Sequence, residues 1–311
     1  MRLLPRCLLP IGLLLLLGAC AQAPRHDAPA ADEPQDPALA AVFGGCQGVQ
    51  PQPDSLAGAR SFTYAEASGR ALRIHLFEPA TAPGAAAARP AVLFFFGGGW
   101  RAGRVESFAR QARAFAAAGY VAALADYRVK CRDGTTPLAA LDDARAAYAW
   151  LRERSSGLGI DRERIVLAGG SAGGHLALAT AQRAAGSGAQ PAALWLLNPA
   201  VDLLGPAPWY LKPAALSLSP SVLPVWDLPP TLIQHGDADV VVPIASVRAF
   251  CARAAQRGRQ CRLDEYAGVG HSFYQRRDAD PALGGRSAYE DTLARAFEFL
   301  AAQGLPGAAP Q

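Results

Sequence analysis

The chain has 311 residues, of which 51% are hydrophobic and 18% are charged, so it is long and apolar enough to bury one enzyme-sized core. Its formal net charge is only +4, and two of the basic residues, Arg2 and Arg6, lie within the first 19 positions. A basic excess this small and scattered argues against nucleic-acid binding and is typical of a solvated surface.

Residues 1–19 have the pattern of an export signal, because the two arginines precede an apolar run over residues 8–17 that ends in small residues. That run is too short to cross a bilayer. The segment Leu17-Gly18-Ala19-Cys20 resembles the lipobox of bacterial lipoproteins, whose cysteine is acylated. We therefore expect an exported protein anchored by lipid at Cys20, with Ala21 favouring the outer membrane, facing the periplasm or the cell surface. An ordinary secretory signal with an incidental Cys20 is the alternative.

Residues 20–45 are predicted to form a flexible tether. The stretch 21–41 holds eight Ala and four Pro and almost no large apolar side chain, so it cannot support a core. We expect one folded domain over residues 46–303 and a flexible tail over residues 304–311.

Within the folded part, short apolar runs alternate with longer amphipathic segments, which predicts an α/β protein with a mostly parallel sheet and helices on both faces. The predicted strands are 61–64, 72–77, 91–96, 121–126, 164–168, 193–198, 231–235 and 262–266. The predicted helices are 105–118, 137–154, 173–184, 244–257 and 287–302. The first two strands lack an intervening helix, so we expect an antiparallel edge hairpin. Residues 204–230 contain seven prolines and form either a compact loop near the site or a structural connector.

Four cysteines in the predicted domain form an even set in an exported chain, which favours disulfides. Cys251 is expected to pair with Cys261, because a helix ending near residue 257 would turn back into a strand beginning near Cys261. Cys46 with Cys131 then follows by elimination. A zinc site is the alternative, but no Cys-x-x-Cys or clustered histidines accompany these residues, so we expect no metal.

Ser171 is the candidate nucleophile. It lies in Gly169-Gly-Ser-Ala-Gly173, which fits Gly-x-Ser-x-Gly, between a predicted strand and a predicted helix. The glycines permit a sharp turn, and the helix N-terminus supplies positive potential to a developing oxyanion. In a glycine-rich chain the same serine could equally be a helix cap, so the prediction depends on its partners.

A serine hydroxyl needs a base and a group that orients the base. His271 lies on a loop between the last predicted strand and the last predicted helix, free to reach the carboxyl edge of the sheet, and is predicted to be the base. The other four histidines are predicted to lie elsewhere: His26 in the tether, His75 in an early strand, His175 on the helix after the serine and His235 at the end of a buried strand.

Asp239 is predicted to be the orienting acid. It follows a strand and falls between the serine and His271 in chain order, within the run His235-Gly-Asp-Ala-Asp-Val-Val-Val-Pro243. Asp237, nearer the strand, is expected to accept a hydrogen bond from turn backbone instead.

The backbone N–H groups of Gly97, Gly98 and Ala172 are predicted to form an oxyanion hole. Ala172 follows the serine, and the two glycines lie in the loop after the third strand, where glycines can turn N–H groups toward a bound carbonyl. A glycine-rich turn without a chemical role is the alternative. Trp100 and Phe273, next to these groups in the chain, are predicted to contact substrate.

Taken in order, these motifs resemble the hormone-sensitive-lipase-like and acetyl xylan or feruloyl esterase-like α/β-hydrolases. The motifs that carry the resemblance are Gly97-Gly-Gly-Trp100, Asp126-Tyr-Arg128, Gly134-Thr-Thr-Pro137, Leu158-Gly-Ile-Asp161, Gly169-Gly-Ser-Ala-Gly-Gly-His175, Pro229-Pro-Thr-Leu232 and Gly270-His271. The resemblance covers residues 60–302 and implies an α/β-hydrolase three-layer sandwich with a minimal cap. Phe96 departs from the family pattern by replacing the histidine that leads the Gly-Gly-Gly-Trp motif and braces its loop. Ser272 departs from it too, since relatives often have glycine after the histidine.

The hypothesis from the sequence is therefore a cofactor-free serine esterase that forms an acyl-enzyme on Ser171 and releases short, acetyl-like acyl groups from sugars or small alcohols. Its expected partners are a small-molecule or saccharide ester and, through the lipid, a membrane. A serine exopeptidase of the same fold is one alternative, although the added propeller or amine-binding acidic pair is not evident. A non-catalytic, hydrolase-fold surface lipoprotein is another, although such proteins normally lose a triad residue.

Overall fold

A computed structural model describes residues 45–80, 88–205 and 215–305 of the chain. The predicted signal peptide, Cys20, almost all of the tether and residues 306–311 lie outside the described residues. All described residues belong to one unit, Pro34–Gln311. Within the described ranges, no helix has both the length and the hydropathy needed to span a membrane.

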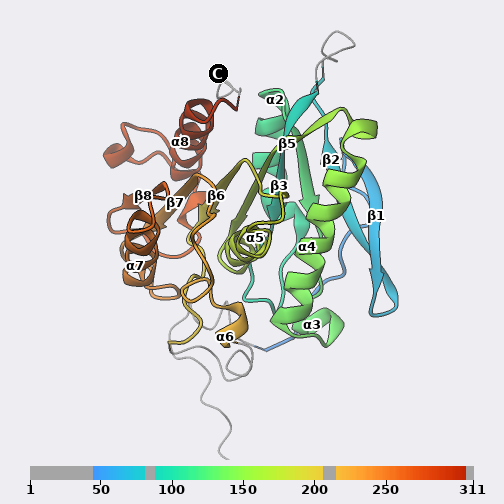
Figure 1. Cartoon of the computed structure of the whole chain (residues 1–311), viewed down its shortest axis with the longest axis horizontal. Helices are drawn as coiled ribbons and strands as arrows, with labels where there is room; N and C mark the ends of the chain where they lie inside the picture. The colour runs from blue at the N-terminus through green and yellow to red at the C-terminus, as the bar shows by residue number, and fades with distance from the viewer. Residues whose placement is uncertain (1–44, 81–87, 206–214, 306–311) are drawn as a thin grey trace, which may run out of the picture. The chain divides into compact units, whose positions relative to one another are not determined.

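Eight strands form a single sheet (Figure 1). They are β1 (Arg60–Ala67), β2 (Arg70–Phe77), β3 (Arg89–Phe95), β4 (Val121–Ala125), β5 (Ile160–Gly170), β6 (Ala193–Leu197), β7 (Thr231–Gly236) and β8 (Cys261–Tyr266). Their order is β1-β2-β4-β3-β5-β6-β7-β8. β1 and β2 form the predicted antiparallel hairpin at one edge, β2 runs antiparallel to β4, and all other pairs are parallel. The carboxyl ends of the parallel strands therefore meet at one edge.

Helices cover both faces of this sheet, as predicted. The longer ones are α2 (Ala109–Ala117), α4 (Pro137–Arg154), α5 (Ala172–Arg183), α7 (Ile244–Ala255) and α8 (Ala288–Ala302). On one face α2 and α8 contact each other through the rings of Phe115 and Phe297, which lie 4.6 Å apart. On the other face α4 packs beside α5, while Gln182 of α5 and Arg253 of α7 both donate to the carbonyl oxygen of Pro220. This arrangement is the predicted α/β-hydrolase sandwich.

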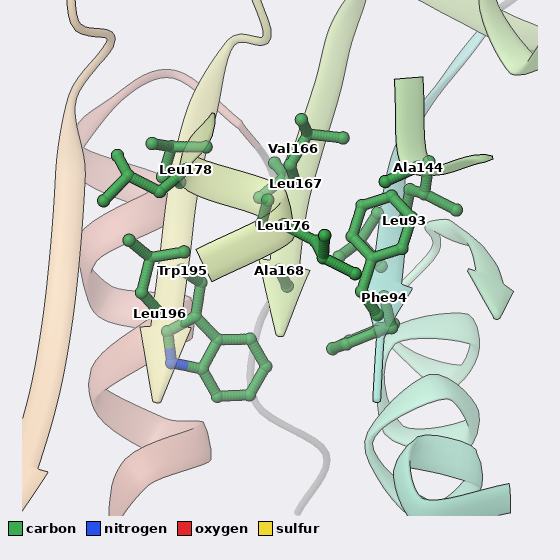
Figure 2. Packing of buried hydrophobic residues seen from close by; sticks show 14 of the residues in the cluster. Leu93, Phe94, Ala144, Val166, Leu167, Ala168, Leu176, Leu178, Trp195 and Leu196 are labelled. Carbon is green, nitrogen blue, oxygen red and sulfur yellow. The ribbon is translucent and has the colours of Figure 1, made fainter. Parts of the chain in front are cut away.

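The core is centred on β6, on residues 90–95 of β3 and on residues 165–170 of β5, which are buried on both sheet faces, as parallel strands require. Figure 2 shows side chains from these strands packed with Leu176 and Leu178 of α5. Helix α5 is itself buried all round, from Ala172 to Gln182. The turn that carries Ser171 is thus anchored between a core strand and a core helix.

Two glycines let α5 begin close to β3. A Cβ atom at Gly173 would lie 2.0 Å from the carbonyl oxygen of Phe95, and one at Gly169 would lie 2.5 Å from the carbonyl carbon of Gly173. No other residue fits at these two positions without moving backbone.

The structure differs from the sequence predictions in a few places. Two helices of four residues, α3 (Lys130–Asp133) and α6 (Ala215–Leu218), were not expected, and β5 begins at Ile160 because Ile160 pairs with Arg89 across a register shift. Leu305, in the predicted tail, is buried against the core. Both predicted disulfides, Cys46–Cys131 and Cys251–Cys261, are formed.

Candidate active site

Ser171 occupies a sharp turn between β5 and α5. Its backbone has φ 53° and ψ −120°, a left-handed conformation that costs a residue with a Cβ about 1–3 kcal/mol. Neighbouring backbone holds the turn: the Ser171 N–H donates to Leu197 O at 2.9 Å, and its carbonyl accepts from His175 N at 3.0 Å. This is the strained strand-turn-helix that presents a nucleophilic serine in this kind of fold.

Three predicted residues meet at the carboxyl edge of the sheet. Ser171 Oγ lies 2.9 Å from His271 Nε2, and His271 Nδ1 lies 2.7 Å from Asp239 Oδ2. Since a carboxylate only accepts, Nδ1 carries the imidazole proton, and Nε2 is left to accept the hydroxyl proton of Ser171. The residues come from the ends of β5, β7 and β8, and the serine and histidine are 100 positions apart in the chain.

The Asp239 carboxylate is fully buried and accepts from four directions. Its Oδ1 accepts from Val241 N and Val242 N, both at 2.9 Å, and its Oδ2 accepts from His271 and, at 3.3 Å, from His235 Nε2. Burial alone would raise the pKa of Asp239, but the hydrogen bonds from His235, His271 and Val242 outweigh it and hold that pKa well below its ordinary value. Asp239 therefore stays ionised at neutral pH.

His235 is a contact of the triad that the sequence did not reveal. It was expected only as a hydrogen-bonded structural residue at the end of β7, and its side chain is fully buried. Its Nε2 lies 2.8 Å from Val242 O, and because a carbonyl only accepts, Nε2 must carry the proton. That same N–H points at Asp239 Oδ2, so His235 helps to hold the carboxylate. The only sequence signal was its place four residues before Asp239.

Asn198, just after β6, is a second residue that sequence reasoning missed. It is fully buried with φ 37°. Its Oδ1 accepts from Ser272 N at 3.2 Å, which fixes the amide orientation, and its Nδ2 then lies 3.4 Å from His271 Nε2. Asn198 thus holds the backbone beside His271. Its position at the end of a strand adjacent to the serine strand was the available signal.

The loops after β7 and β8 are joined to each other by two hydrogen bonds, one from a backbone N–H to a side chain and one between backbone groups. Asp237 Oδ1 accepts from Gly268 N at 2.6 Å, and Ala238 N donates to Val269 O at 3.2 Å. Asp237 does bond turn backbone, as expected, but the turn belongs to the loop that carries His271. The acid and the base are therefore positioned as one unit.

The three predicted oxyanion donors lie around the serine turn. A Cβ on Gly97 would lie 3.4 Å from Ser171 Cβ, so the glycine passes close to the nucleophile. Gly98 has φ 120°, which favours glycine, and Ala172 is the first residue of α5, where helical N–H groups have no intrahelical acceptor. Their role in binding an oxyanion stays a prediction.

Phe96, which replaces the family's histidine, is held by a stacked ring. It lies against Tyr127 with ring centroids 4.0 Å apart and planes 12° apart, and the Tyr127 hydroxyl donates to Phe96 O at 2.6 Å. An aromatic stack with one hydrogen bond therefore fixes the start of this loop.

Trp100 and Phe273 are both buried, at 3% and 2% exposed. Trp100 packs edge-on against His175, at 4.9 Å between ring centroids, and Phe273 packs against Tyr266 at 4.6 Å. Their predicted contact with substrate stays a prediction, because in this structure both rings pack against protein.

His175 points away from the serine, as expected from its place on α5. Its Nε2 donates to Leu218 O in α6 at 2.9 Å. Burial lowers the pKa of His175 to about 4, so the ring is neutral near pH 7.

Comparison with known proteins agrees with this geometry. Residues 92–213 match the model of a family described as having the alpha/beta hydrolase fold. The esterase LipI of Mycobacterium tuberculosis is 32% identical over 238 residues, which cover 74% of this chain and 65% of LipI. The carboxylesterase NlhH of the same organism is 38% identical over 109 residues, covering 35% of this chain and 34% of NlhH. The chain thus spans under two thirds of the length of these curated relatives.

Solved structures are matched over a larger share of their length. Thermogutta terrifontis esterase 2 with butyrate bound is 33% identical, with a TM-score of 0.72, covering 82% of this chain and 97% of that one. The same values hold for that esterase phosphonylated by cyclosarin.

Proposed function

Because the chain belongs to the α/β-hydrolase family, we propose that it is a carboxylic ester hydrolase with Ser171 as nucleophile, His271 as general base and Asp239 as orienting acid. The observation that carries the proposal is the continuous series of hydrogen bonds from the Ser171 hydroxyl through His271 to Asp239, at 2.9 and 2.7 Å. The esterase names of the relatives support the reaction class.

The first half of the reaction acylates the enzyme. His271 Nε2 takes the proton from Ser171 Oγ as the oxygen bonds to the ester carbonyl carbon, and the N–H groups of Gly97, Gly98 and Ala172 stabilise the oxyanion. The intermediate collapses, the carbon–alkoxy bond breaks, and the alcohol leaves with the proton from His271.

The second half repeats these steps with water. His271 takes a proton from water, the hydroxide attacks the acyl carbon, and the bond to Ser171 Oγ breaks as the serine regains the proton. The acid is released and the free enzyme returns. Throughout, the ionised Asp239 keeps the proton of neutral His271 on Nδ1 and stabilises the imidazolium.

For the substrate, we propose a short acyl group on a sugar or small alcohol. The related esterase with butyrate bound supports a short acid. In the described part of the connection from β6 to β7, the helical structure is limited to the four-residue α6, which supports an uncapped site for a compact ester. The esterase relatives favour this substrate class over the peptides of an exopeptidase.

For the location, we propose export and lipid anchoring at Cys20. The lipobox-like segment supports the anchor. The two disulfides support passage into an oxidising compartment, since such bonds rarely persist in a reducing cytosol.

A substrate panel with a nucleophile variant tests the reaction class. We expect p-nitrophenyl acetate and butyrate to be cleaved faster than the octanoate ester, and all three faster than aminoacyl p-nitroanilides. Ser171→Ala should lower kcat by about 10⁴-fold or more while the thermal midpoint stays close to that of the unaltered protein. Ser187→Ala, at an exposed serine, is the matched control and should retain full activity. Full turnover by Ser171→Ala, or preference for the anilides, would overturn the proposal.

A further inference from the structure

The loop after β3, residues 96–104, has a strained backbone conformation, within which Arg101 N and Ala102 N donate to Gly98 O at 3.0 and 3.1 Å. Gly98, Gly99, Trp100 and Gly103 all have positive φ, at 120°, 62°, 57° and 115°. For Trp100 this is a costly conformation, which persists only when surrounding structure enforces it. We call residues 96–104 the oxyanion loop, because it contains the predicted donors Gly97 and Gly98.

Helix α3 holds the middle of the oxyanion loop. Lys130 N donates to Trp100 O, and Cys131 N donates to Arg101 O, both at 2.9 Å. N–H groups in the first turn of a helix have no carbonyl partner within it, so α3 can offer them to the loop. The orientation of the loop's peptide groups therefore depends on where α3 sits.

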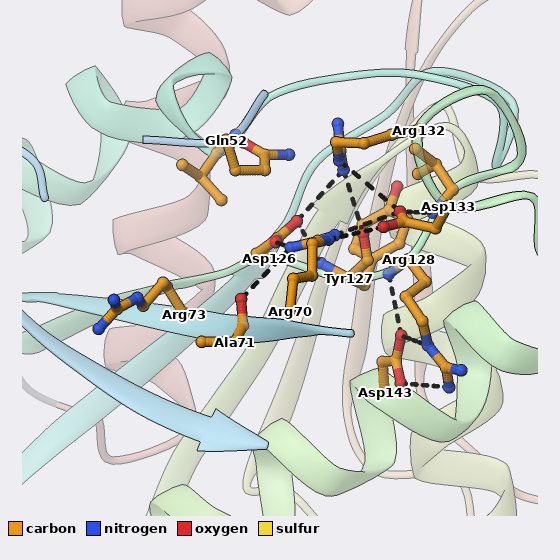
Figure 3. Close-up of polar contacts among 12 residues, drawn as sticks. Gln52, Arg70, Ala71, Arg73, Asp126, Tyr127, Arg128, Arg132, Asp133 and Asp143 are labelled. Atoms are coloured by element: carbon orange, nitrogen blue, oxygen red, sulfur yellow. Dashed lines mark hydrogen bonds and ion pairs between the residues drawn. The ribbon is translucent and has the colours of Figure 1, made fainter. Parts of the chain in front are cut away.

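A buried group of opposite charges fixes α3 in turn (Figure 3). Arg70 of β2 bonds Asp126 and Asp133, and Arg132 lies 3.3 Å from Asp126 Oδ1. The two carboxylates are at most 2% exposed. Asp133, the last residue of α3, is tied to β2, and Arg132 beside it is tied to Asp126 after β4. Arg132 also donates to Gly103 O in the oxyanion loop at 3.3 Å.

The segment before β1 holds the same loop from the opposite end. Gln52 Nε2 donates to Gly103 O and Gln52 Oε1 accepts from Val105 N, both at 3.2 Å. The Gln52 amide thus forms hydrogen bonds with the carbonyl of Gly103 and the N–H of Val105, on either side of residue 104. Six positions earlier, Cys46 forms its disulfide with Cys131 of α3. The segment 46–52 is therefore joined both to α3 and to the oxyanion loop.

We propose that Gln52 and the Cys46–Cys131 disulfide are positioning residues for catalysis. They hold α3 and the oxyanion loop together, so that the N–H groups of Gly97 and Gly98 keep the orientation that binds the oxyanion. This inference rests on the proposed function, since it needs an ester hydrolase that uses this loop. The second disulfide, Cys251–Cys261, joins α7 to β8, which three strands separate from β3 in the sheet, and this makes it a matched control.

The first test compares the two disulfides. The double variant Cys46→Ser/Cys131→Ser is compared with Cys251→Ser/Cys261→Ser and the unaltered enzyme, using p-nitrophenyl butyrate and counting active sites by complete fluorophosphonate labelling. Losing one oxyanion donor outright costs about 10²–10³ in kcat, so a loosened loop should cost about 10-fold per labelled site, with KM changed less than about 3-fold. The control pair should retain kcat within about 2-fold.

The second test leaves both disulfides intact. Gln52→Ala removes both contacts with the loop, whereas Gln52→Glu keeps an acceptor for Val105 N but loses the donor to Gly103 O. We expect kcat to fall by about 3- to 10-fold in Gln52→Ala, with an intermediate value in Gln52→Glu and little change in KM. The exposed neighbour Gln50, whose amide contacts Gly48 O at 3.4 Å, supplies the control Gln50→Ala with unchanged kcat.

The outcomes separate the inference from the proposed function. An unaltered protein without esterase activity would overturn the proposed function. The positioning role alone would be overturned if the unaltered enzyme is active and the folded variants retain its kcat. Those variants are Gln52→Ala and Cys46→Ser/Cys131→Ser. Equal losses in the Cys251→Ser/Cys261→Ser control would also overturn it, because the effect would then be general destabilisation.

Discussion

The two halves of the active site are held in place by different means. The acid and base half, formed by the loops after β7 and β8, is held by contacts between neighbouring strand ends, such as Asp237 with Gly268. The oxyanion half is held by distant parts of the chain, with Gln52 lying 51 positions before its partner Gly103 and Cys46 lying 85 positions before Cys131. The proposed acid and base are therefore brought together by sheet assembly, whereas the predicted oxyanion donors depend on separate attachments.

The halves also differ in where their polar contacts come from. Three of the four donors to the Asp239 carboxylate, His235, Val241 and Val242, lie within four positions of it in the chain. The oxyanion loop has two internal hydrogen bonds to Gly98 O, but it is also held by Gln52 and by α3, which lie outside it in the chain. We expect substitutions in the first half to stop the chemistry, and substitutions in the second half to weaken it by degrees.

The largest effect is expected from Asp239→Asn in the acid and base half. The amide would place a donor against His271, which would turn its proton to Nε2 and remove the acceptor for the serine hydroxyl. We expect kcat/KM to fall by about 10⁴-fold while the protein stays folded. Asp237→Asn is the control, because an amide oxygen can still accept from Gly268 N. Steady-state kinetics with p-nitrophenyl butyrate measure both, and a loss below about 10-fold in Asp239→Asn would contradict the assigned acid.

A smaller effect is expected from Gly98→Ala in the oxyanion half. A Cβ at this position would lie 2.4 Å from Ala102 O, and the φ of 120° disfavours alanine. The loop must shift, and we expect kcat to fall by about 10²–10³. Gly157→Ala, where nothing lies within 4 Å of the added carbon, should be neutral. If Gly98→Ala kept full kcat with normal folding, Gly98 would have no role in the oxyanion hole.

The smallest effect concerns the contribution of His175, whose ring packs against Trp100 of the oxyanion loop, to the stability of the protein. Burial lowers the pKa of His175 to about 4, against an ordinary value of 6.5. Between pH 6.5 and pH 4, His175 is protonated in the unfolded chain but not in the folded protein. Its contribution to the free energy of unfolding is therefore fully present above about pH 6.5 and is lost as the pH falls toward 4. The difference between the two pKa values of His175 corresponds to about 3 kcal/mol of free energy of unfolding between pH 6.5 and pH 4.

Urea unfolding at several pH values measures that contribution. His175→Gln, which can still donate to Leu218 O, should unfold with a shallower dependence on pH between 6.5 and 4. An identical slope in the variant would mean that His175 is protonated equally in the folded and unfolded states.

Most of the fold followed from local patterns in the sequence. The apolar runs located all eight strands, and helix α4 has the predicted bounds, with Pro137 at its first turn. The helices α3 and α6 were missed because four residues carry no helical period. β5 was predicted too short because residues 161–164 near its start are all polar and none of them is buried, so that only the apolar half was recognised.

The residues at the centre of the site were easier to predict than those that support them. Ser171, Asp239 and His271 stand in motifs whose order along the chain indicates their roles. Gln52 and Asn198 stand in no motif, and each acts through a side-chain contact with distant backbone. Such contacts depend on the tertiary arrangement, which neighbouring residues in the sequence do not encode.

The strand order has a consequence for when the protein becomes reactive. From β5 to β8 the strands lie in the sheet in the order in which they are synthesised. A chain completed only through β6 holds the serine turn and the oxyanion loop, but neither Asp239 nor His271. Since chains emerge from the ribosome N-terminus first, β8 and the loop that carries His271 are made after the serine turn. On the proposed mechanism, the serine therefore gains its base only once the last strand and the loop after it have been made.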